Sequence, residues 1–165
     1  MHGRIFVIVD EDSLKNGDRF CPFEEHEMMD WIPACDYVLQ ESENDFKESI
    51  EWLSERFNLN LKIELKDSDG EKVPVGVLGQ DGVKSLIHAL EEDRKNRLKA
   101  VKEELQKENP DVWRIAQLAY DDSAFYFVLS QGEFSNEMGF LESLKQFQKE
   151  YSGSLFITES YDYHC

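Results

Sequence analysis

The sequence predicts a single α+β domain over residues 1–165, with a mixed sheet of about five or six strands and helices packed mainly on one face. Short apolar runs bounded by turn residues recur along the chain, and such runs are typical of strands. Longer segments with an apolar residue every three or four positions lie between several of them, and this spacing is typical of helices. One strand pair is a clear hairpin while the others are joined through helices, which favours helices layered on a mixed sheet.

The chain is long enough to fold around one core. A domain of 165 residues buries roughly 70% of the surface that its unfolded chain exposes. Apolar residues make up 41% of the sequence, and 11 Phe, 6 Tyr and 3 Trp supply large side chains for a core. We find no repeat of fixed period, no low-complexity tract and no linker, so we expect one ordered domain.

The first expected strand covers residues 3–9, where Ile, Phe and Val lie between Gly3 and an acidic cluster at residues 10–12. A continuous apolar run of this kind indicates a strand buried on both faces, so we expect it to be central in the sheet. Residues 13–31 contain turn residues and an acidic run, which indicates an irregular surface segment with at most a short helix before Pro33. Residues 35–40 form the second expected strand.

A helix is expected after Ser42, whose spacing to Asp45 is that of a capping box. Apolar residues then follow at helical spacing: Phe46, Ile50, Leu53 and Phe57. Alternation of apolar and polar residues over residues 59–66 predicts a strand, and turn residues at 67–70 lead into residues 72–78 as its hairpin partner. Pro74 favours an edge position for this partner.

A long helix is expected from Gly82 to about Glu108. Its buried stripe is predicted to consist of Val83, Leu86, Ile87, Leu90, Leu98, Val101 and Leu105. The middle of this helix, residues 91–97, is nearly all charged. We therefore expect the middle to project into solvent or to pair with another chain.

The last third of the chain is expected to add two more helices and two strands. Asn109 is the expected cap of the first helix, with Pro110 at the first helical position. Residues 124–129 form a strand, Ser135 caps the second helix, and residues 154–159 form the last strand.

Charge is unevenly distributed along the sequence. The chain has 35 acidic and 18 basic residues, a net charge of -17, and residues 1–55 contain 15 of the acidic but only 4 of the basic residues. Residues 56–110 carry 11 of each sign. A surface this acidic repels nucleic acid and anionic membranes and attracts basic protein surfaces. We therefore expect a basic protein partner and no direct binding of nucleic acid or membrane.

Aromatic residues interleaved with these acids indicate a docking surface. Tyr37, Phe46 and Trp52 lie among carboxylates, and Tyr161 and Tyr163 flank Asp162 in the same way. Aromatic anchors ringed by charge suit binding to a basic groove, since charge speeds association and aromatics supply affinity. The predicted partner-binding residues are Glu24, Glu25, Glu27, Asp30, Asp36, Tyr37, Glu41, Glu43, Asp45 and Glu48. An inhibitor, an immunity protein or a DNA mimic would have this charge profile, whereas in the alternative interpretation Phe46 and Trp52 are core residues and the acids only maintain solubility.

A small metal-dependent hydrolase is the alternative function. Asp10 and Asp12 follow a hydrophobic strand, where two carboxylates can share a divalent cation. Over about five residues this segment resembles the start of phosphatases of the haloacid dehalogenase type, which use an aspartate nucleophile. The resemblance ends at residues 13–14, and Asp121 and Asp122, the further candidate ligands, follow a helical stretch where that family has a strand.

Four other motifs have simpler structural explanations, and we expect no cofactor. The glycine spacing in residues 76–85 is not that of a P-loop. Residues 67–70 resemble the start of a calcium loop, but a strand follows them. A general-base role for His88 has no supporting neighbours in the sequence. The spacing of the remaining candidate ligands fits no closed zinc pattern: Cys21, His26, Cys35, His164 and Cys165.

Three cysteines without a CxxC pair make a disulfide framework improbable. The apolar run at residues 5–9 is too short for the core of a signal peptide, and no stretch reaches the length of a membrane span. We therefore expect a cytoplasmic protein. Self-association through the long helix would make it a homodimer.

Overall fold

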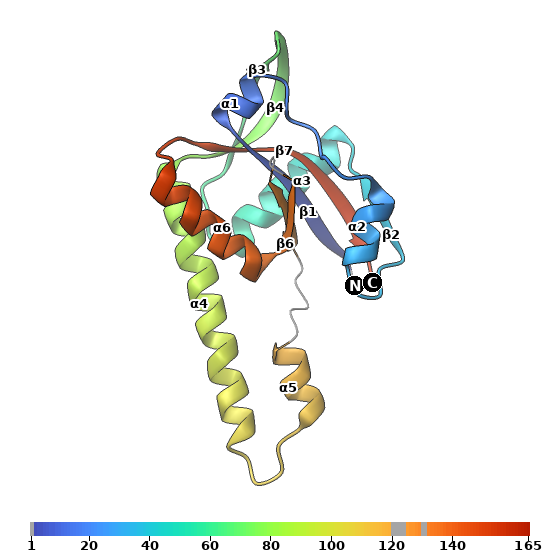
Figure 1. The fold of residues 1–165 in the computed structure, drawn as a ribbon, viewed down its shortest axis with the longest axis vertical. Helices are drawn as coiled ribbons and strands as arrows, with labels where there is room; N and C mark the ends of the chain where they lie inside the picture. Colours follow the sequence, from blue (N-terminus) through green and yellow to red (C-terminus); the bar gives the residue numbers. More distant parts are fainter. Residues whose placement is uncertain (1, 120–124, 130–131) are drawn as a thin grey trace.

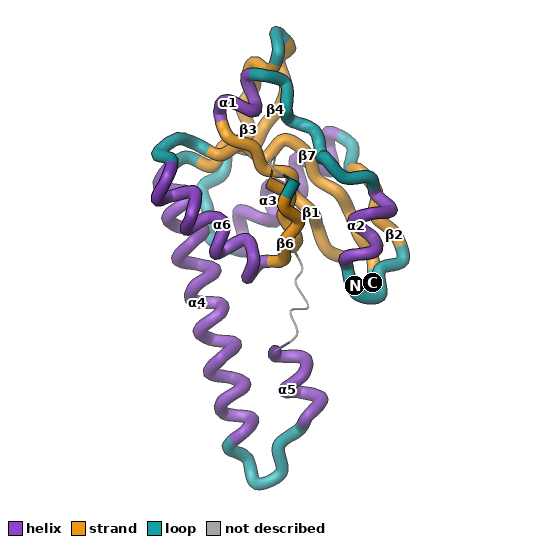
Figure 2. The backbone as a smooth tube through the Cα atoms, in the orientation of Figure 1, coloured by secondary structure: helices purple, strands orange, loops and turns teal. Residues whose placement is uncertain are grey.

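A mixed sheet forms the centre of the computed structural model, which describes residues 2–119, 125–129 and 132–165. Within these residues the sheet has seven strands, and six helices surround it (Figures 1 and 2). The strands are β1 (His2–Asp10), β2 (Tyr37–Gln40), β3 (Lys62–Ser68), β4 (Glu71–Leu78), β5 (Phe125–Leu129), β6 (Glu133–Asn136) and β7 (Leu155–His164). The helices are α1 (Glu11–Lys15), α2 (Glu25–Trp31), α3 (Glu43–Arg56), α4 (Gln80–Leu105), α5 (Val112–Ala119) and α6 (Glu137–Glu150). The predicted α+β class is confirmed.

Strand β1 lies inside the sheet, as its apolar run predicts. The strand order is β3-β4-β7-β1-β5-β6, with β1 parallel to β5 and antiparallel to β7. On the side away from β1, strand β7 pairs with β4 through Leu155–Ile157 and with β2 through Tyr161–His164. Two strands therefore share one side of β7, and residues 158–160 lie between them.

The two faces of the sheet carry separate cores. Phe6 and Ile8 of β1 point to the face covered by α3, α4 and α6, while Ile5 and Val7 point to the face covered by α2. This alternation follows from the two-residue period of a strand. The three long helices share one face, which agrees with the prediction, and the shorter α1 and α2 lie on the other.

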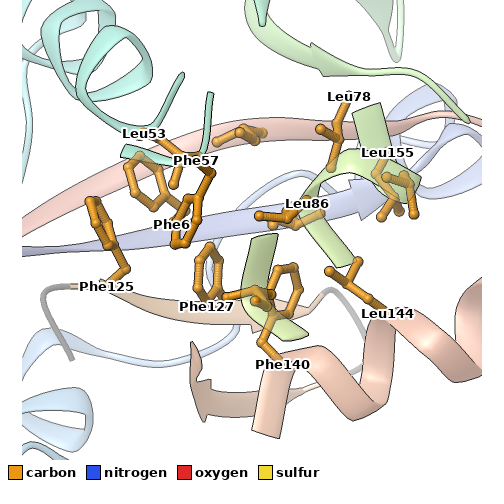
Figure 3. Close-up of a cluster of buried hydrophobic side chains, with 14 of the residues drawn as sticks. Phe6, Leu53, Phe57, Leu78, Leu86, Phe125, Phe127, Phe140, Leu144 and Leu155 are labelled. Atoms are coloured by element: carbon orange, nitrogen blue, oxygen red, sulfur yellow. The ribbon is translucent and has the colours of Figure 1, made fainter. Parts of the chain in front are cut away.

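Aromatic side chains fill the core under the long helices (Figure 3). Phe127 of β5 stacks on Phe140 of α6 with ring centroids 4.0 Å apart, and it lies 6.1 Å from Phe6. All three rings are fully buried. Phe46, Ile50, Leu53 and Phe57 of the α3 segment join this core, as their helical spacing predicts.

The segment after β1 is more ordered than expected, because its acids form helix caps. The Asp10 carboxylate accepts the backbone N–H of Ser13 at 2.7 Å and caps α1. Glu24 and Glu27 form a reciprocal capping box at the start of α2. Carboxylates in a first helical turn are favoured by the helix dipole. Helix α2 is the short helix that was allowed before Pro33, whereas α1 was not predicted.

Strands β3 and β4 form the predicted hairpin, with the turn at Asp69 and Gly70. Both turn residues have positive φ, 51° and 81°, and the second is glycine because such backbone conformations favour it. The predicted edge position of this strand is wrong, because β4 lies between β3 and β7. Pro74 is tolerated there because it lies beyond the part of β4 that pairs with β7. Leu65 is 67% exposed, because this end of the hairpin extends past the core.

Helix α4 begins two residues earlier than predicted and is only partly buried. Val83, Leu86, Ile87 and Leu90 are buried, but Leu98 and Leu105 are 62% and 57% exposed, so the predicted stripe is wrong beyond Leu90. Four of the seven residues of the charged middle are exposed, which agrees with the expectation that it faces solvent. Surface ion pairs also join it to α6, since Glu91 pairs with Lys145 at 2.8 Å and Arg94 pairs with Glu142 at 3.1 Å.

The end of α4, the following loop and α5 extend away from the sheet (Figure 1). We call residues 98–119 the arm. Helix α5 begins at Val112 because the Asp111 carboxylate accepts the backbone N–H groups of Trp113 and Arg114, at 2.9 and 3.1 Å. Asp111, and not the predicted Asn109, therefore caps this helix.

The last elements differ from expectation mainly in length. Strand β6 was not predicted, and its last two residues were assigned to the start of a helix capped by Ser135. The α6 cap is Asn136, which accepts the Gly139 N–H at 2.9 Å, in place of Ser135. Strand β7 extends five residues beyond the predicted end at Glu159. Residue 124, the predicted start of β5, lies outside the described residues.

Candidate functional site

The ten predicted partner-binding residues fall into three groups along the chain. Glu24, Glu25, Glu27 and Asp30 lie on or next to α2. The second group surrounds β2 and the third lies in the first half of α3. The second group is Asp36, Tyr37 and Glu41, and the third is Glu43, Asp45 and Glu48. Because α2 and α3 cover opposite faces of the sheet, these residues do not form one flat acidic face.

Several of these groups already have partners within the fold. The Glu41 side chain is only 4% exposed, and its carboxylate lies 2.7 Å from the Arg4 guanidinium. Asp36 pairs with His164 at 3.0 Å, and the Tyr37 hydroxyl donates to Asp162 at 3.1 Å. Internal contacts therefore hold most of the β2 group.

The aromatic residues predicted as anchors lie in different surroundings. Phe46 is 5% exposed and belongs to the core, so it is not available for docking. Trp52 is 36% exposed, with its ring 4.9 Å from the Phe125 ring and 5.3 Å from the Arg4 guanidinium carbon. Tyr161 and Tyr163 are buried in the core under α2.

A groove beside α2 contains aromatic residues that the sequence analysis missed. It encloses about 670 Å³ between α2 and the edge strand β6. Trp31 of α2 is 45% exposed, and its ring lies 4.8 Å from the Phe23 ring and 5.2 Å from the Phe134 ring. Tyr126 of β5 stacks on Phe134 at 5.3 Å and forms part of the groove wall. We call this feature the aromatic groove.

Carboxylates lie along the rim of the aromatic groove. Residues three, four and seven apart share one side of a helix, so Glu24 and Glu27 lie on the same side of α2 as Trp31. Glu133 of β6 does not belong to this rim, because its carboxylate accepts the Ser143 hydroxyl of α6 at 2.6 Å. The groove thus combines apolar area with negative charge along α2.

One signal in the sequence pointed to the groove. Phe23 and Trp31 flank the acidic run of α2, so the interleaving of aromatics and acids was present there as well. Phe134 could not be placed, because β6 is too short for an alternating pattern to identify it. Tertiary pairing of β6 with β5 brings Phe134 to Trp31.

Glu25 protects the edge of the sheet next to the groove. Its carboxylate accepts the backbone N–H of Gln40 at 2.9 Å, on β2, which has β7 as its strand neighbour. A carboxylate in this position blocks the addition of a further strand. The acids of α2 therefore have at least two uses, one structural at β2 and one available for binding at the groove.

A second carboxylate site lies at residues 158–160 of β7, between the part of β7 that pairs with β4 and the part that pairs with β2. The register of β7 against β1 shifts here, which indicates a bulge. Glu159 accepts the Cys21 backbone N–H at 2.7 Å and the Gln40 side-chain amide at 2.8 Å. Burial raises the pKa of Glu159 above its ordinary value, and these hydrogen bonds offset only part of the effect. The adjoining pocket encloses about 260 Å³ and includes Arg19.

This raised pKa predicts how folding stability responds to pH. The folded protein holds the Glu159 proton more tightly than the unfolded chain, so this group favours folding at low pH and loses that contribution as pH rises through its folded pKa. As pH rises from about 4.5, the ordinary pKa of a glutamate, to neutral, we expect the free energy of unfolding of Glu159→Gln to fall less than that of the wild type. Urea unfolding of both proteins across this range measures the difference. Parallel stability curves would contradict the prediction.

Of the four candidate hydrolase residues, the structure describes two. Asp10 caps α1 and Asp12 is exposed, while Asp121 and Asp122 lie outside the described residues. Across residues 2–119, 125–129 and 132–165, no three His, Cys, Asp or Glu side chains gather closely enough to hold a metal ion. Among the described residues, Cys21, Cys35 and Cys165 form no disulfide bond.

The remaining motifs have structural roles. Residues 76–85 complete β4 and begin α4, with Gly79 as its N-cap residue. Residues 67–70 form the hairpin turn, where Asp67 accepts the Gly70 N–H at 3.2 Å. His88 lies exposed on α4.

Among the described residues, no helix is both long enough and apolar enough to cross a membrane. No protein-family model, curated protein or solved structure matches this chain.

Proposed function

We propose that this protein binds a basic surface of a partner protein through the aromatic groove and the acidic rim around it. The observation that carries the proposal is the position of Trp31, which is 45% exposed in an aromatic groove and lies on the same side of α2 as Glu24 and Glu27. Aromatic anchors surrounded by charge are the usual composition of a binding hot spot. An inhibitor, an immunity protein or a DNA mimic would use such a surface to cover the basic site of its target.

The charge of the whole chain supports this proposal. A net charge of -17 attracts a basic partner over distances of about one Debye length, roughly 8 Å at physiological salt. The groove then supplies contact area at short range. Glu24 has 80% of its side chain exposed, so it remains available to a partner.

Affinity capture from the native host, followed by titration of the purified partner, tests the proposal. We expect the partner to be basic, with an association rate that falls as salt rises. Trp31→Ala should weaken binding at least about tenfold, the size of a hot-spot truncation. Phe20→Ala is the matched control, because Phe20 is 60% exposed and lies outside the groove.

A pair of charge-neutralising variants separates the rim from the net charge. Glu24→Gln with Glu27→Gln keeps oxygen acceptors for the α2 cap but removes two negative charges from the rim. Glu51→Gln with Glu55→Gln removes two charges from exposed positions of α3 on the opposite face. The first pair should slow association more than the second. Equal effects, or a captured partner that is not basic, would exclude the aromatic groove as the binding site.

A further inference from the structure

The arm exposes apolar side chains that no described part of the chain covers. Leu98 and Leu105 of α4 are 62% and 57% exposed, and Val112 and Trp113 of α5 are 77% and 78% exposed. Leu105 ends α4 and Val112 begins α5, so both residues lie toward the end of the arm away from the sheet (Figure 1). Clustered exposure of large apolar residues marks an interaction surface.

The exposed stripe lies on a face of α4 that α5 does not cover. Arg97, Val101 and Glu104 are partly or fully buried at spacings of three and four residues, so they share one side of the helix. Leu98, Lys102 and Leu105 share another side and are exposed. This second side is therefore open to a further helix.

Charge separates the arm from the rest of the molecule. Residues 98–119 contain four acidic and four basic residues, so the whole net charge of -17 lies elsewhere. Two copies of so acidic a chain repel each other through most of their surfaces. The neutral arm allows close approach without that repulsion.

Charge is ordered along the second half of α4 and the loop that follows it. Five basic residues and no acidic ones occur in residues 94–102, whereas residues 103–111 contain four acidic residues and one basic residue. An antiparallel pair of arms would place the basic stretch of each copy beside the acidic stretch of the other. With the two-fold axis near residues 101 and 102, Leu98 of one copy lies level with Leu105 of the other. The arm is thus complementary to itself in both charge and apolar contacts.

We infer that the arm binds the arm of a second copy of this chain, antiparallel and around a two-fold axis. Such an interface is closed, because each copy contributes the same surface. It buries Leu98 and Leu105 and leaves the aromatic groove of each copy free for a partner. The dimer therefore presents two grooves.

Analytical ultracentrifugation over a range of protein concentrations tests this inference. The wild type should form dimers and no larger species. Leu98→Asp with Leu105→Asp should raise the dissociation constant at least about tenfold, as a buried hot spot does. Leu65→Asp is the matched control, since Leu65 is 67% exposed on β3. A wild type that stays monomeric, or dimers that both variants weaken equally, would overturn the inference.

A charge-exchange experiment tests the antiparallel arrangement directly. Lys99→Glu with Lys102→Glu makes the arm mainly acidic, and Glu103→Lys with Glu108→Lys makes it mainly basic. Each variant alone should dimerise more weakly than the wild type, and an equimolar mixture should form a 1:1 dimer of wild-type affinity. Lys62→Glu with Lys72→Glu makes the same change of net charge as Lys99→Glu with Lys102→Glu, but on the β3–β4 hairpin. This control should leave dimerisation unchanged. A mixture that dimerises no better than its components would rule out antiparallel pairing.

Discussion

Replacing Phe127 by alanine is expected to lower the free energy of unfolding by about 3–5 kcal/mol. Phe127 is fully buried, and its ring stacks on Phe140 and lies against Phe6 (Figure 3). Its loss leaves a cavity bounded by a strand and a helix, neither of which can move inward without breaking other contacts. Because domains of this size have total stabilities of about 5–15 kcal/mol, this change removes a large part of the total.

Urea unfolding measures this effect, and Phe20→Ala is its matched control. Phe20 is 60% exposed, and its ring has the Arg19 guanidinium carbon 4.7 Å from the centroid. Its loss should cost less than about 1 kcal/mol. If Phe127→Ala leaves too little folded protein to measure, Phe127→Leu should give a smaller loss. Equal costs for Phe127→Ala and Phe20→Ala would mean that Phe127 is not in the core.

Replacing Arg4 by alanine is expected to cost about 3 kcal/mol, because it leaves a buried carboxylate without its counter-charge. The Glu41 side chain is 4% exposed and pairs with Arg4 at 2.7 Å. Arg4 also pairs with Asp162 and donates to the Ser49 hydroxyl at 2.8 Å. One guanidinium therefore joins β1 to β7, to α3 and to the residue that follows β2.

Two further variants show whether this cost comes from the buried pair. Arg94→Ala removes a surface pair with Glu142, in which both side chains are more than half exposed, and should cost less than about 1 kcal/mol. In a double-mutant cycle, Arg4→Ala and Glu41→Gln should be coupled by about 1–3 kcal/mol. Denaturant unfolding of the four proteins gives this value. Additive effects would show that Arg4 and Glu41 stabilise the fold independently.

The sequence predicted well those elements whose apolar pattern repeats several times. The stripe of α3 and the first turns of α4 are buried as expected, and the alternating hairpin forms, because these patterns reflect one continuous contact with the core. Leu98 and Leu105 continue the α4 pattern but are exposed, since periodicity identifies an apolar side without identifying what covers it.

The candidate site was harder to predict, because tertiary contacts determine which charges remain available. Glu41 and Glu48 lie in the same acidic stretch of sequence, yet Glu41 is buried against Arg4 while Glu48 is exposed. The aromatic groove depends on Phe134, whose neighbours Trp31 and Phe23 are more than 100 residues away in the chain. Local patterns contain no information about such pairings.

The position of β7 has a consequence for how the chain folds during synthesis. This strand follows every other described element in the chain, yet it lies against β1, β2 and β4. Until residues 155–164 leave the ribosome, β1 lacks one of its two neighbours, and neither β2 nor the β3–β4 hairpin has a strand to join it to the sheet. Contacts between such distant residues slow folding. The domain should therefore acquire its native sheet late, with the apolar side chains of β1 exposed to chaperones or to other nascent chains until then.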